Sequence, residues 1–432
     1  MIRFVIICCS IFTKSTRLTM YLSKKSIFFL VFLSCFQWVK SQVIEPNYIK
    51  SIQLRPLQEN SFSIIVPLGT SLELNFDDLE GDQKDYYYKI EHMTHDWNPS
   101  NLLANQYIEG FQSQIIFDVE NSFNTFQNYT HYRVQFPNQN TRITQSGNYQ
   151  LSVLDSDDEV IFTRRFTLYE SIAVVGVNVT RSRTTNSLNQ EQTVNFVVNH
   201  PTIKLNMPNQ EIHVAILQNQ NWNTSITDIQ PQFFKPGQLI YRYMEKINFA
   251  GGNEYLFYDN KTIWNNSVNI ARSIRKELFH NYLYPYRNLA VKNYTFNPDI
   301  NGQFVIRTLE GDNPKVEADY ARMHFTLEVD EQFKNKRVYV YGAFNNFQLL
   351  EENQMTFDSV NKTYNASILL KQGFYNYTYM IQDSNGNISQ AEIRGDFSKT
   401  ENEYTVIVYY KPLGGLFDRV IGVGSISFEG ER

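Results

Sequence analysis

Three side chains that could bind a metal ion lie close together in the segment His92-Met-Thr-His95-Asp96. Imidazole and carboxylate groups are common ligands of zinc and related metals. In a strand, residues an odd number apart point to opposite faces, so His92 and His95 would not reach the same ion. A turn could bring them together, but no further ligand is evident nearby. We therefore predict a structural turn, with Asp96-Trp-Asn-Pro-Ser100 ending a strand, and no bound metal.

The sequence motifs of the commonest catalytic chemistries are absent. The sequence has no phosphate-binding Gly-rich loop, no dinucleotide fingerprint, no nucleophile-elbow serine and no helical zinc-protease motif. Its three cysteines, Cys8, Cys9 and Cys35, all lie in the first 41 residues. Removal of that leader would exclude disulfides, cysteine zinc sites and thiol nucleophiles. We expect no catalytic residue and no cofactor, hence no enzyme; a hydrolase that uses scattered His and Asp residues is the alternative.

The first 41 residues have the layout of a secretory signal peptide. Lys24-Lys25 precedes an apolar run at residues 27–36, and Ser41 offers a cleavage point. Met20 could be the true start, because the segment that follows it is already a complete signal. A membrane anchor and a lipoprotein acylated at Cys35 are the alternatives. The apolar run is shorter than the roughly 20 residues that span a bilayer, so we predict export with a cleaved leader.

The charge of the chain without its leader excludes one class of partner. The leader holds six basic residues and no acidic one, which leaves 33 basic and 44 acidic residues and a net charge of −11. An acidic protein has no general attraction for nucleic acid or for anionic lipid. We therefore predict no nucleic-acid binding. No stretch after the leader is apolar enough to span a membrane.

From residue 49 onward, short runs of alternating apolar and polar residues predict β-strands. One example is the pair of runs at residues 149–154 and 160–168, joined by the turn-forming residues 155–158. The 28 Tyr and 32 Phe residues also suit a pleated, half-buried surface. The best helix candidate, residues 268–279, fits β structure equally well. The pattern predicts an all-β fold of about three tandem β-sandwich, immunoglobulin-like domains.

Breaks in this pattern divide the chain into three β domains after the leader. The first is expected at residues 42–170, where Leu168-Tyr-Glu170 closes its last strand. The second is expected at residues 171–314, because Glu310-Gly-Asp-Asn-Pro314 has the composition of a loop. The third sandwich and a C-terminal tail then occupy residues 315–432.

The third domain resembles the early-set sandwich of glycogen-binding modules. The resemblance rests on Tyr339-Val-Tyr-Gly-Ala-Phe-Asn-Asn-Phe347 and on the later Tyr375-Asn-Tyr-Thr-Tyr379. In those modules a Trp in the first turn helps to stack on sugar, and Phe347 takes its place here. The later Trp and Lys contacts have no clear counterpart. The resemblance implies a shared fold without carbohydrate binding, in which these aromatic residues form sandwich core and edge.

Taken across nearly the whole chain after the leader, the sequence resembles the plug protein family of the bacterial type IX secretion system, found in Bacteroidetes. The matching stretches of the first domain are residues 86–92, 96–100, 107–111, 122–125, 129–132, 136–138 and 146–149. The later ones are residues 299–302, 317–320, 344–346, 400–404, 408–410 and 417–422. No single motif is diagnostic, and their order carries the resemblance. The usual Arg-rich turn of the tail appears here as Lys411-Pro-Leu-Gly-Gly415.

The resemblance implies a periplasmic protein that binds the periplasmic mouth of a very large outer-membrane β-barrel translocon. Such proteins close the lumen while no substrate is passing. Barrel diameter grows with strand number, and large barrels leave an open lumen unless they are plugged. A rigid body can cap such a pore without chemistry. The alternative is a periplasmic or surface glycan-binding β-sandwich protein.

We expect the loop at residues 94–110 to meet the barrel. The loop contains His95, Trp97 and Tyr107 among polar residues, and aromatic side chains often dominate the binding energy of interfaces. The alternative is that Trp97, Tyr107 and Phe111 only close the end of the first sandwich. On the interface hypothesis, Trp97→Ala weakens binding to the translocon and leaves the β-type circular dichroism intact.

Overall fold

The structure, a computed structural model, describes residues 45–58, 61–288 and 293–430. The predicted signal peptide at residues 1–41 and the possible start at Met20 lie outside the described residues. The described residues belong to one compact unit, which is 48% strand and 6% helix. The predicted all-β fold of tandem sandwiches is therefore confirmed. In the part of the chain that is described, no helix has the length and apolarity needed to cross a membrane.

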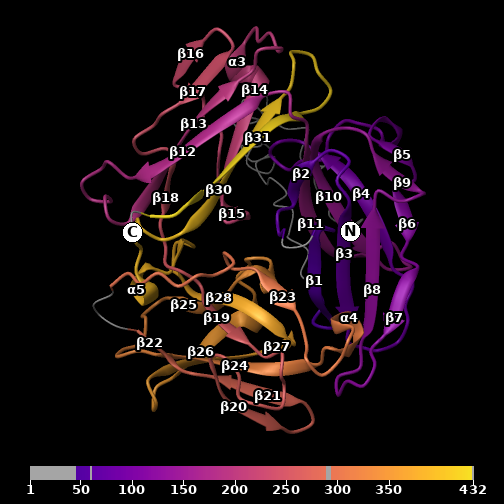
Figure 1. The fold of residues 1–432 in the computed structure, drawn as a ribbon, viewed down its shortest axis with the longest axis vertical. Coiled ribbons are helices and arrows are strands. Elements are labelled where there is room, and N and C mark those ends of the chain that lie inside the picture. The colour runs from indigo at the N-terminus through magenta and orange to yellow at the C-terminus, as the bar shows by residue number, and fades with distance from the viewer. Residues whose placement is uncertain (1–44, 59–60, 289–292, 431–432) are drawn as a thin grey trace, which may run out of the picture. The chain divides into compact units, whose positions relative to one another are not determined.

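The first sandwich pairs a four-stranded sheet with a five-stranded one (Figure 1, indigo and purple). The four-stranded sheet has the order β1 (Ile49–Pro56), β3 (Leu72–Asp78), β8 (Thr130–Phe136), β7 (Asp118–Asn121). The five-stranded sheet has the order β2 (Ile65–Pro67), β11 (Val160–Tyr169), β10 (Gly147–Leu154), β4 (Tyr87–Met93), β6 (Ser113–Ile115). The 3-10 turn η1 (Ala104–Gln106) precedes a small ribbon of β5 (Ile108–Gly110) and β9 (Thr141–Ile143). Alternate aromatic side chains fill the core, where Phe76 stacks on Tyr132 with ring centroids 5.0 Å apart.

The second sandwich combines strands from two distant parts of the chain. One sheet has the order β12 (Val174–Arg181), β13 (Glu191–Asn199), β17 (Gln238–Tyr241), β16 (Phe233–Lys235), with β18 (Asn248–Ala250) also on β13. The other has the order β15 (Asn221–Thr227), β14 (Ile212–Gln218), β30 (Asn402–Tyr410), β31 (Arg419–Phe428). The short helix α3 (Pro208–Glu211) leads into β14. In Figure 1 the yellow β30 and β31 therefore lie among magenta strands.

The third sandwich is one continuous sheet folded over its own core. Its path is β19 (Leu256–Asp259), β28 (Gly373–Gln382), β25 (Arg337–Tyr341), β26 (Gln354–Asp358), β27 (Thr363–Lys371), β24 (Tyr320–Glu328), β21 (Phe279–Leu283), β20 (Ile270–Arg275). The strands β22 (Tyr286–Arg287), β23 (Phe304–Ile306) and β29 (Ile388–Ser389) add to β24 or β28. Short helical segments connect them: α4 (Pro314–Glu317), η2 (Ala343–Asn345), η3 (Glu351–Asn353) and α5 (Ala391–Arg394). Because β26 pairs with both β25 and β27, it joins the two layers. The helix candidate at residues 268–279 forms β20 and the start of β21.

The sheets group the strands differently from the predicted ranges 171–314 and 315–432. Strands β19 to β23 fall in the earlier range but pair with each other, β24 or β28 of the third sandwich. Strand β30 falls in the later range, yet its residues 404–410 pair with the whole of β14. The third sandwich is thus inserted between β18 and β30. Loop composition marks where a strand ends, but it does not tell which distant strand will be its neighbour.

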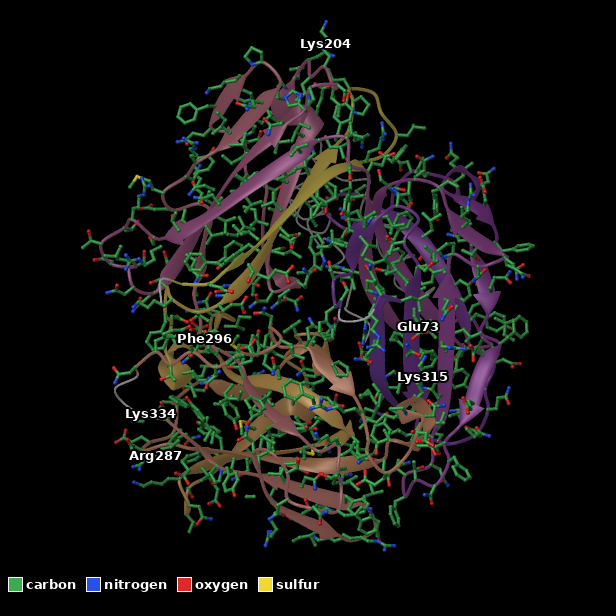
Figure 2. All side chains as sticks on the ribbon, in the orientation of Figure 1. Glu73, Lys204, Arg287, Phe296, Lys315 and Lys334 are labelled. Carbon is green, nitrogen blue, oxygen red and sulfur yellow. The ribbon has the colours of Figure 1, made fainter. Side chains whose placement is uncertain are left out.

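Buried polar contacts connect the first sandwich to the third. Lys371 Nζ lies 2.7 Å from Asp77 Oδ2, and both side chains are almost fully buried. Asp77 also accepts hydrogen bonds from His131 Nδ1 at 2.6 Å and from the Tyr320 hydroxyl at 2.7 Å. A half-buried neighbour, the Glu73–Lys315 ion pair labelled in Figure 2, spans 3.2 Å between β3 and α4. The two sandwiches therefore meet through a satisfied, desolvated network.

Candidate functional site

The loop after β4, where the sequence placed a turn, lies against the second sandwich. Its backbone closes through Thr94 N to the Asn98 carbonyl at 2.8 Å and Trp97 N to the Thr94 carbonyl at 3.0 Å. Trp97 itself takes a left-handed conformation with φ of +63°. That conformation is uncommon for a bulky residue and is held by its surroundings. The tight turn directs His95 and Trp97 toward strands of the second sandwich.

Trp97 is packed at the junction of the first and second sandwiches. Its indole makes an edge contact with Trp222 of β15, with centroids 4.9 Å apart and planes at 85°. The guanidinium of Arg165, from β11, lies 4.5 Å from the centroid of the Trp97 ring. Such aromatic and cation–π contacts each contribute roughly 0.5–1.5 kcal/mol. Trp97 therefore has a structural role at this junction.

Tyr107 lies inside the first sandwich, with a relative exposure of 3%. Its hydroxyl donates to the Ile90 carbonyl at 3.4 Å and accepts from Gln112 Nε2 at 2.9 Å. Burial raises the pKa of this phenol. Contrary to the prediction, Tyr107 offers no surface to a partner, and it instead closes the end of the sandwich. The sequence of a loop does not show whether an aromatic residue contacts a partner protein or closes the end of its own sandwich.

His95, the remaining predicted anchor, hydrogen-bonds to a buried carboxylate of the second sandwich. Its Nδ1 lies 3.1 Å from Asp418 Oδ2, and its backbone N–H donates to the same oxygen at 2.9 Å. Burial opposes protonation of His95, but the hydrogen bond and charge of Asp418 outweigh it and raise the pKa of His95. Burial likewise opposes ionisation of Asp418, whereas the two bonds from His95 lower the pKa of Asp418.

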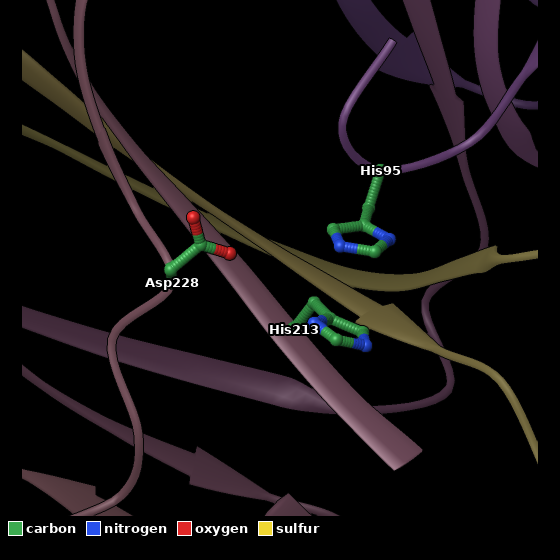
Figure 3. Close-up of side chains that lie close together, drawn as sticks. All are labelled: His95, His213 and Asp228. Atoms are coloured by element: carbon green, nitrogen blue, oxygen red, sulfur yellow. The ribbon is translucent and has the colours of Figure 1, made fainter. Parts of the chain in front are cut away.

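His95 stacks on His213 of β14, with ring centroids 3.7 Å apart and planes inclined by 15° (Figure 3). Burial and the neighbouring His95 lower the pKa of His213. Asp228, exposed after the end of β15, turns its carboxylate toward the two rings (Figure 3). One nitrogen of each ring and one oxygen of Asp228 all lie within 4.8 Å of one another. The sequence analysis considered His92 as the partner of His95 and did not identify His213 or Asp228. Residues from different sandwiches come together only in the folded chain, so their spacing in the sequence gives no signal.

His92 occupies a separate, apolar environment. It packs edge-on against Tyr149 and Phe417, with centroids 5.0 and 5.4 Å away. Its Nε2 lies 3.5 Å from the Ser146 carbonyl. Burial lowers the pKa of His92 to about 4, so the ring is neutral at physiological pH. His92 and His95 thus contact different groups, in agreement with their odd spacing at the end of a strand.

An apolar cluster and a hydrogen-bond network complete the junction around His95. The cluster combines Ile65 of the first sandwich with five residues of the second: Ala215, Leu217, Ile407, Tyr409 and Val420. The Tyr409 hydroxyl donates to Asn148 Oδ1 at 3.0 Å, and Asn148 Nδ2 donates to the Thr94 carbonyl at 3.1 Å. The two sandwiches are therefore fixed to each other where His95 and His213 meet.

A group of three carboxylates lies where the second and third sandwiches join. Oxygens of Glu254, Asp299 and Glu401 lie within 4.8 Å of one another. Burial, and then the charges of Glu254 and Glu401, raise the pKa of Asp299 to about 7, although backbone N–H groups of Tyr255 and Asn301 donate to it. The group consists of acidic residues alone, and its members make hydrogen bonds within the chain.

Phe347, which takes the place of the sugar-stacking Trp, is buried with a relative exposure of 7%. Its ring contacts Tyr341, with centroids 5.5 Å apart. Its carbonyl accepts a hydrogen bond of 2.7 Å from Asn223 Nδ2 of the second sandwich. A ring enclosed in this way has no free face for a sugar. The burial of Phe347 agrees with the expectation that it belongs to the sandwich core, whereas no comparison confirms the resemblance to glycogen-binding modules.

Comparisons with known proteins agree with this architecture. The family model described as "Type 9 secretion system plug protein 1st domain" matches residues 49–170. The crystal structure of a hypothetical protein from Parabacteroides merdae ATCC 43184 is 30% identical, with a TM-score of 0.85 over 89% of this chain and 98% of that chain. A search of curated proteins found no match.

Two further solved structures align over most of the chain but with little similarity. The partial N-terminal region of an enterococcal surface protein is 7% identical, covers 92% of this chain and 98% of that chain, and has a TM-score of 0.20. The B domain of a biofilm associated protein is 8% identical, covers 90% and 88%, and has a TM-score of 0.17. TM-scores this low carry no argument about fold or function.

Proposed function

Because the chain belongs to the plug protein family of the type IX secretion system, we propose that it binds the periplasmic mouth of that system's large outer-membrane barrel translocon and closes the lumen while no substrate is passing. The observation that carries the proposal is the family match, which covers the complete first sandwich, from β1 to β11. The family and the all-β fold also point to a non-catalytic protein. A plug acts by filling space, which requires no active site.

The contacts between the sandwiches suit a body that must hold its form against a pore. The first sandwich shares an apolar cluster with the second and a buried ion pair with the third. Pulling either contact apart would expose apolar surface or leave a charge without its partner, and both cost free energy. A barrel wide enough for protein cargo leaves an open lumen. A body with fixed domains can seal it without rearranging.

We propose that the barrel meets three exposed phenylalanines of the first sandwich, and not the predicted set of His95, Trp97 and Tyr107. Phe111, Phe117 and Phe123 have relative exposures of 61%, 79% and 68%. They follow one another on the segment that carries the edge strands β6 and β7 of the two sheets. Single exposed apolar residues are ordinary, but three aromatic rings along one segment resemble interface anchors. Burial of one such ring contributes roughly 1.5–3 kcal/mol.

The binding test is recovery of the partner from solubilised outer membranes with the tagged protein as bait. We expect a very large barrel protein to be recovered with the wild type. The double substitution Phe117→Ser, Phe123→Ser should reduce recovery at least several-fold. The matched control is Val360→Ser, which removes an exposed apolar residue from the third sandwich (88% exposed) and should leave recovery unchanged.

The outcomes of this test separate the function from the surface. If the wild type recovers no barrel protein, the proposed function is refuted. If wild type and double variant recover the barrel equally, only the phenylalanine surface is refuted. Trp97→Ala is a poor probe, because it also removes the contact with Trp222 and can loosen the junction. Closure of the lumen is tested separately: cells without the protein should admit a large hydrophilic solute that wild-type cells exclude.

A further inference from the structure

The cluster of His95, His213 and Asp228 has the composition of a transition-metal site. We propose that it binds one divalent ion of the zinc type and thereby ties the first sandwich to the second. His95 comes from the loop after β4, His213 from β14, and Asp228 from the segment after β15. Two imidazoles and a carboxylate, with water as a fourth ligand, form a donor set that zinc accepts. The inference concerns the stability of the junction and is independent of the proposed plugging function.

The hydrogen bond between His95 and Asp418 resembles the bonds that orient ligating histidines in metal sites. Ligating histidines almost always donate their other ring N–H to a carboxylate, a carbonyl or water. Here Nδ1 of His95 faces Asp418 Oδ2 at 3.1 Å, which places the proton on Nδ1 and leaves the Nε2 lone pair available. Asp418 is almost fully buried, and its Oδ1 has no partner among the described residues. Additional positive charge beside this carboxylate would compensate its burial.

The remaining ring nitrogens at the cluster lack partners of their own. No hydrogen bond joins Nε2 of His95 or either ring nitrogen of His213 to another residue in the described part of the chain. Unlike Asp418 Oδ1, these nitrogens are not fully buried, so water can reach them and a bound cation would replace that water. Asp228 is exposed, so an ion can reach the cluster from solvent.

Ion binding requires a small rearrangement of the stacked rings. Each nitrogen lone pair lies in the plane of its ring, and stacked rings hold these planes nearly parallel, so one imidazole must rotate for both nitrogens to face a common ion. Tetrahedral zinc with bonds of 2.0–2.1 Å places its ligand atoms about 3.3 Å apart, compared with the present limit of 4.8 Å. Asp228 lies outside the strands, where its carboxylate can follow the ion. Binding should therefore break the His95–His213 stack.

The chain contains a matched pair of histidines that lacks the remaining features of the site. His280 and His324 are also nearly parallel, with planes at 16°, but their centroids are 5.1 Å apart. Their Nδ1 and Nε2 atoms already bond to each other at 2.8 Å. Burial, the neighbouring His280 and the basic charges of Lys276 and Arg322 together lower the pKa of His324 to about 4. A histidine pair without a carboxylate and beside positive charge is a control for non-specific binding.

The test is a zinc titration of the full protein after removal of bound metal by a chelator and of any affinity tag. Competition with a chromophoric chelator should give one ion per chain, and zinc should raise the midpoint of thermal unfolding relative to the same protein in EDTA. His213→Ala and Asp228→Asn should abolish this binding. Asp418→Asn should weaken it about 10–100-fold, the usual cost of losing a carboxylate behind a ligand. His324→Ala should bind as the wild type does.

Absence of stoichiometric binding to the wild type would overturn the inference, as would undiminished binding by both His213→Ala and Asp228→Asn. Asp228 is exposed, so its substitution leaves the fold intact, and circular dichroism without zinc verifies this. Equal losses in His324→Ala and Asp228→Asn would also refute the site, because they would show general histidine binding. None of these measurements depends on the translocon.

Discussion

Substitution of Lys371 by methionine should measure how strongly the first and third sandwiches are held together. Lys371 Nζ lies 2.7 Å from Asp77 Oδ2, and the two side chains have exposures of 2% and 1%. The same nitrogen donates to the Lys315 carbonyl at 2.6 Å and lies 4.0 Å from the centroid of the Tyr129 ring. Methionine keeps a similar volume, so the substitution removes the charge with little cavity formation.

The expected loss in the free energy of unfolding depends on the hydrogen bonds that Asp77 retains. Removing one partner of a buried ion pair typically costs about 3–5 kcal/mol, because the other charge stays buried. Asp77 keeps its hydrogen bonds from His131 and Tyr320, so we expect a loss near the lower end, about 3 kcal/mol. In the wild type, burial opposes ionisation of Asp77, and the charge of Lys371 outweighs it and lowers the pKa of Asp77. Without Lys371 that pKa rises, so the loss should shrink as the pH falls and Asp77 takes up a proton.

The assay is urea unfolding followed by circular dichroism and by tryptophan fluorescence. Trp264 of the third sandwich contacts Phe126 of the first, with centroids 5.9 Å apart, and so reports on their separation. The control is Lys50→Met, which breaks the more exposed Lys50–Glu352 pair between the same sandwiches and should cost about 1 kcal/mol or less. The double variant with Asp77→Asn should recover much of the loss. A loss below about 1 kcal/mol for Lys371→Met, or a double variant no more stable than the single one, would refute the reasoning.

Two further substitutions test local features of the fold. Gly147→Ala should destabilise the protein by about 2–4 kcal/mol, measured by thermal or urea unfolding. A Cβ at this position, where φ is +155°, would lie 2.2 Å from His92 Nε2. A loss under about 1 kcal/mol would show that His92 moves aside freely. Asp299→Asn should change the unfolding midpoint more favourably at pH 8 than at pH 5, because the amide stays uncharged at both pH values although its nitrogen cannot accept one of the two backbone hydrogen bonds. Burial and neighbouring carboxylates raise the pKa of Asp299 to about 7, so its folded form keeps the proton and loses stability as the pH rises from about 4 to 7. Equal effects at both pH values would contradict that assignment.

Local strand signals were the part of the fold that the sequence predicted well. The alternating runs at residues 149–154 and 160–168 form β10 and β11, which pair along their length. The acidic turn between them is closed by Asp155 Oδ1, which accepts hydrogen bonds from the backbone of Asp157 and Glu159. These features depend on neighbouring residues, because alternation fixes the buried face and the turn residues fix the reversal.

The same local patterns could not predict which distant strands pair with each other. Strand β30 has the pattern of a generic buried strand, and nothing in that pattern identifies the distant strand β14 as its partner. The same limit applies to the histidines. His95 was singled out because of nearby His92, whereas its contacts are His213 and Asp418, brought together only by the packing of two sandwiches. Tyr107 shows the converse, since an aromatic residue in a polar loop turned out to be core.

The contacts of the first sandwich indicate which surfaces would separate if the protein were released from a translocon. A swing away from the third sandwich must separate Lys371 from Asp77, and a swing away from the second must expose the cluster around Tyr409. Detachment of Phe117 and Phe123 from a partner disturbs neither contact. On the proposed function, release should therefore occur at the outer surface with the three sandwiches moving together. A cross-link between the first and third sandwiches should then leave secretion unchanged, and a block of secretion by that cross-link would show that the body itself must open.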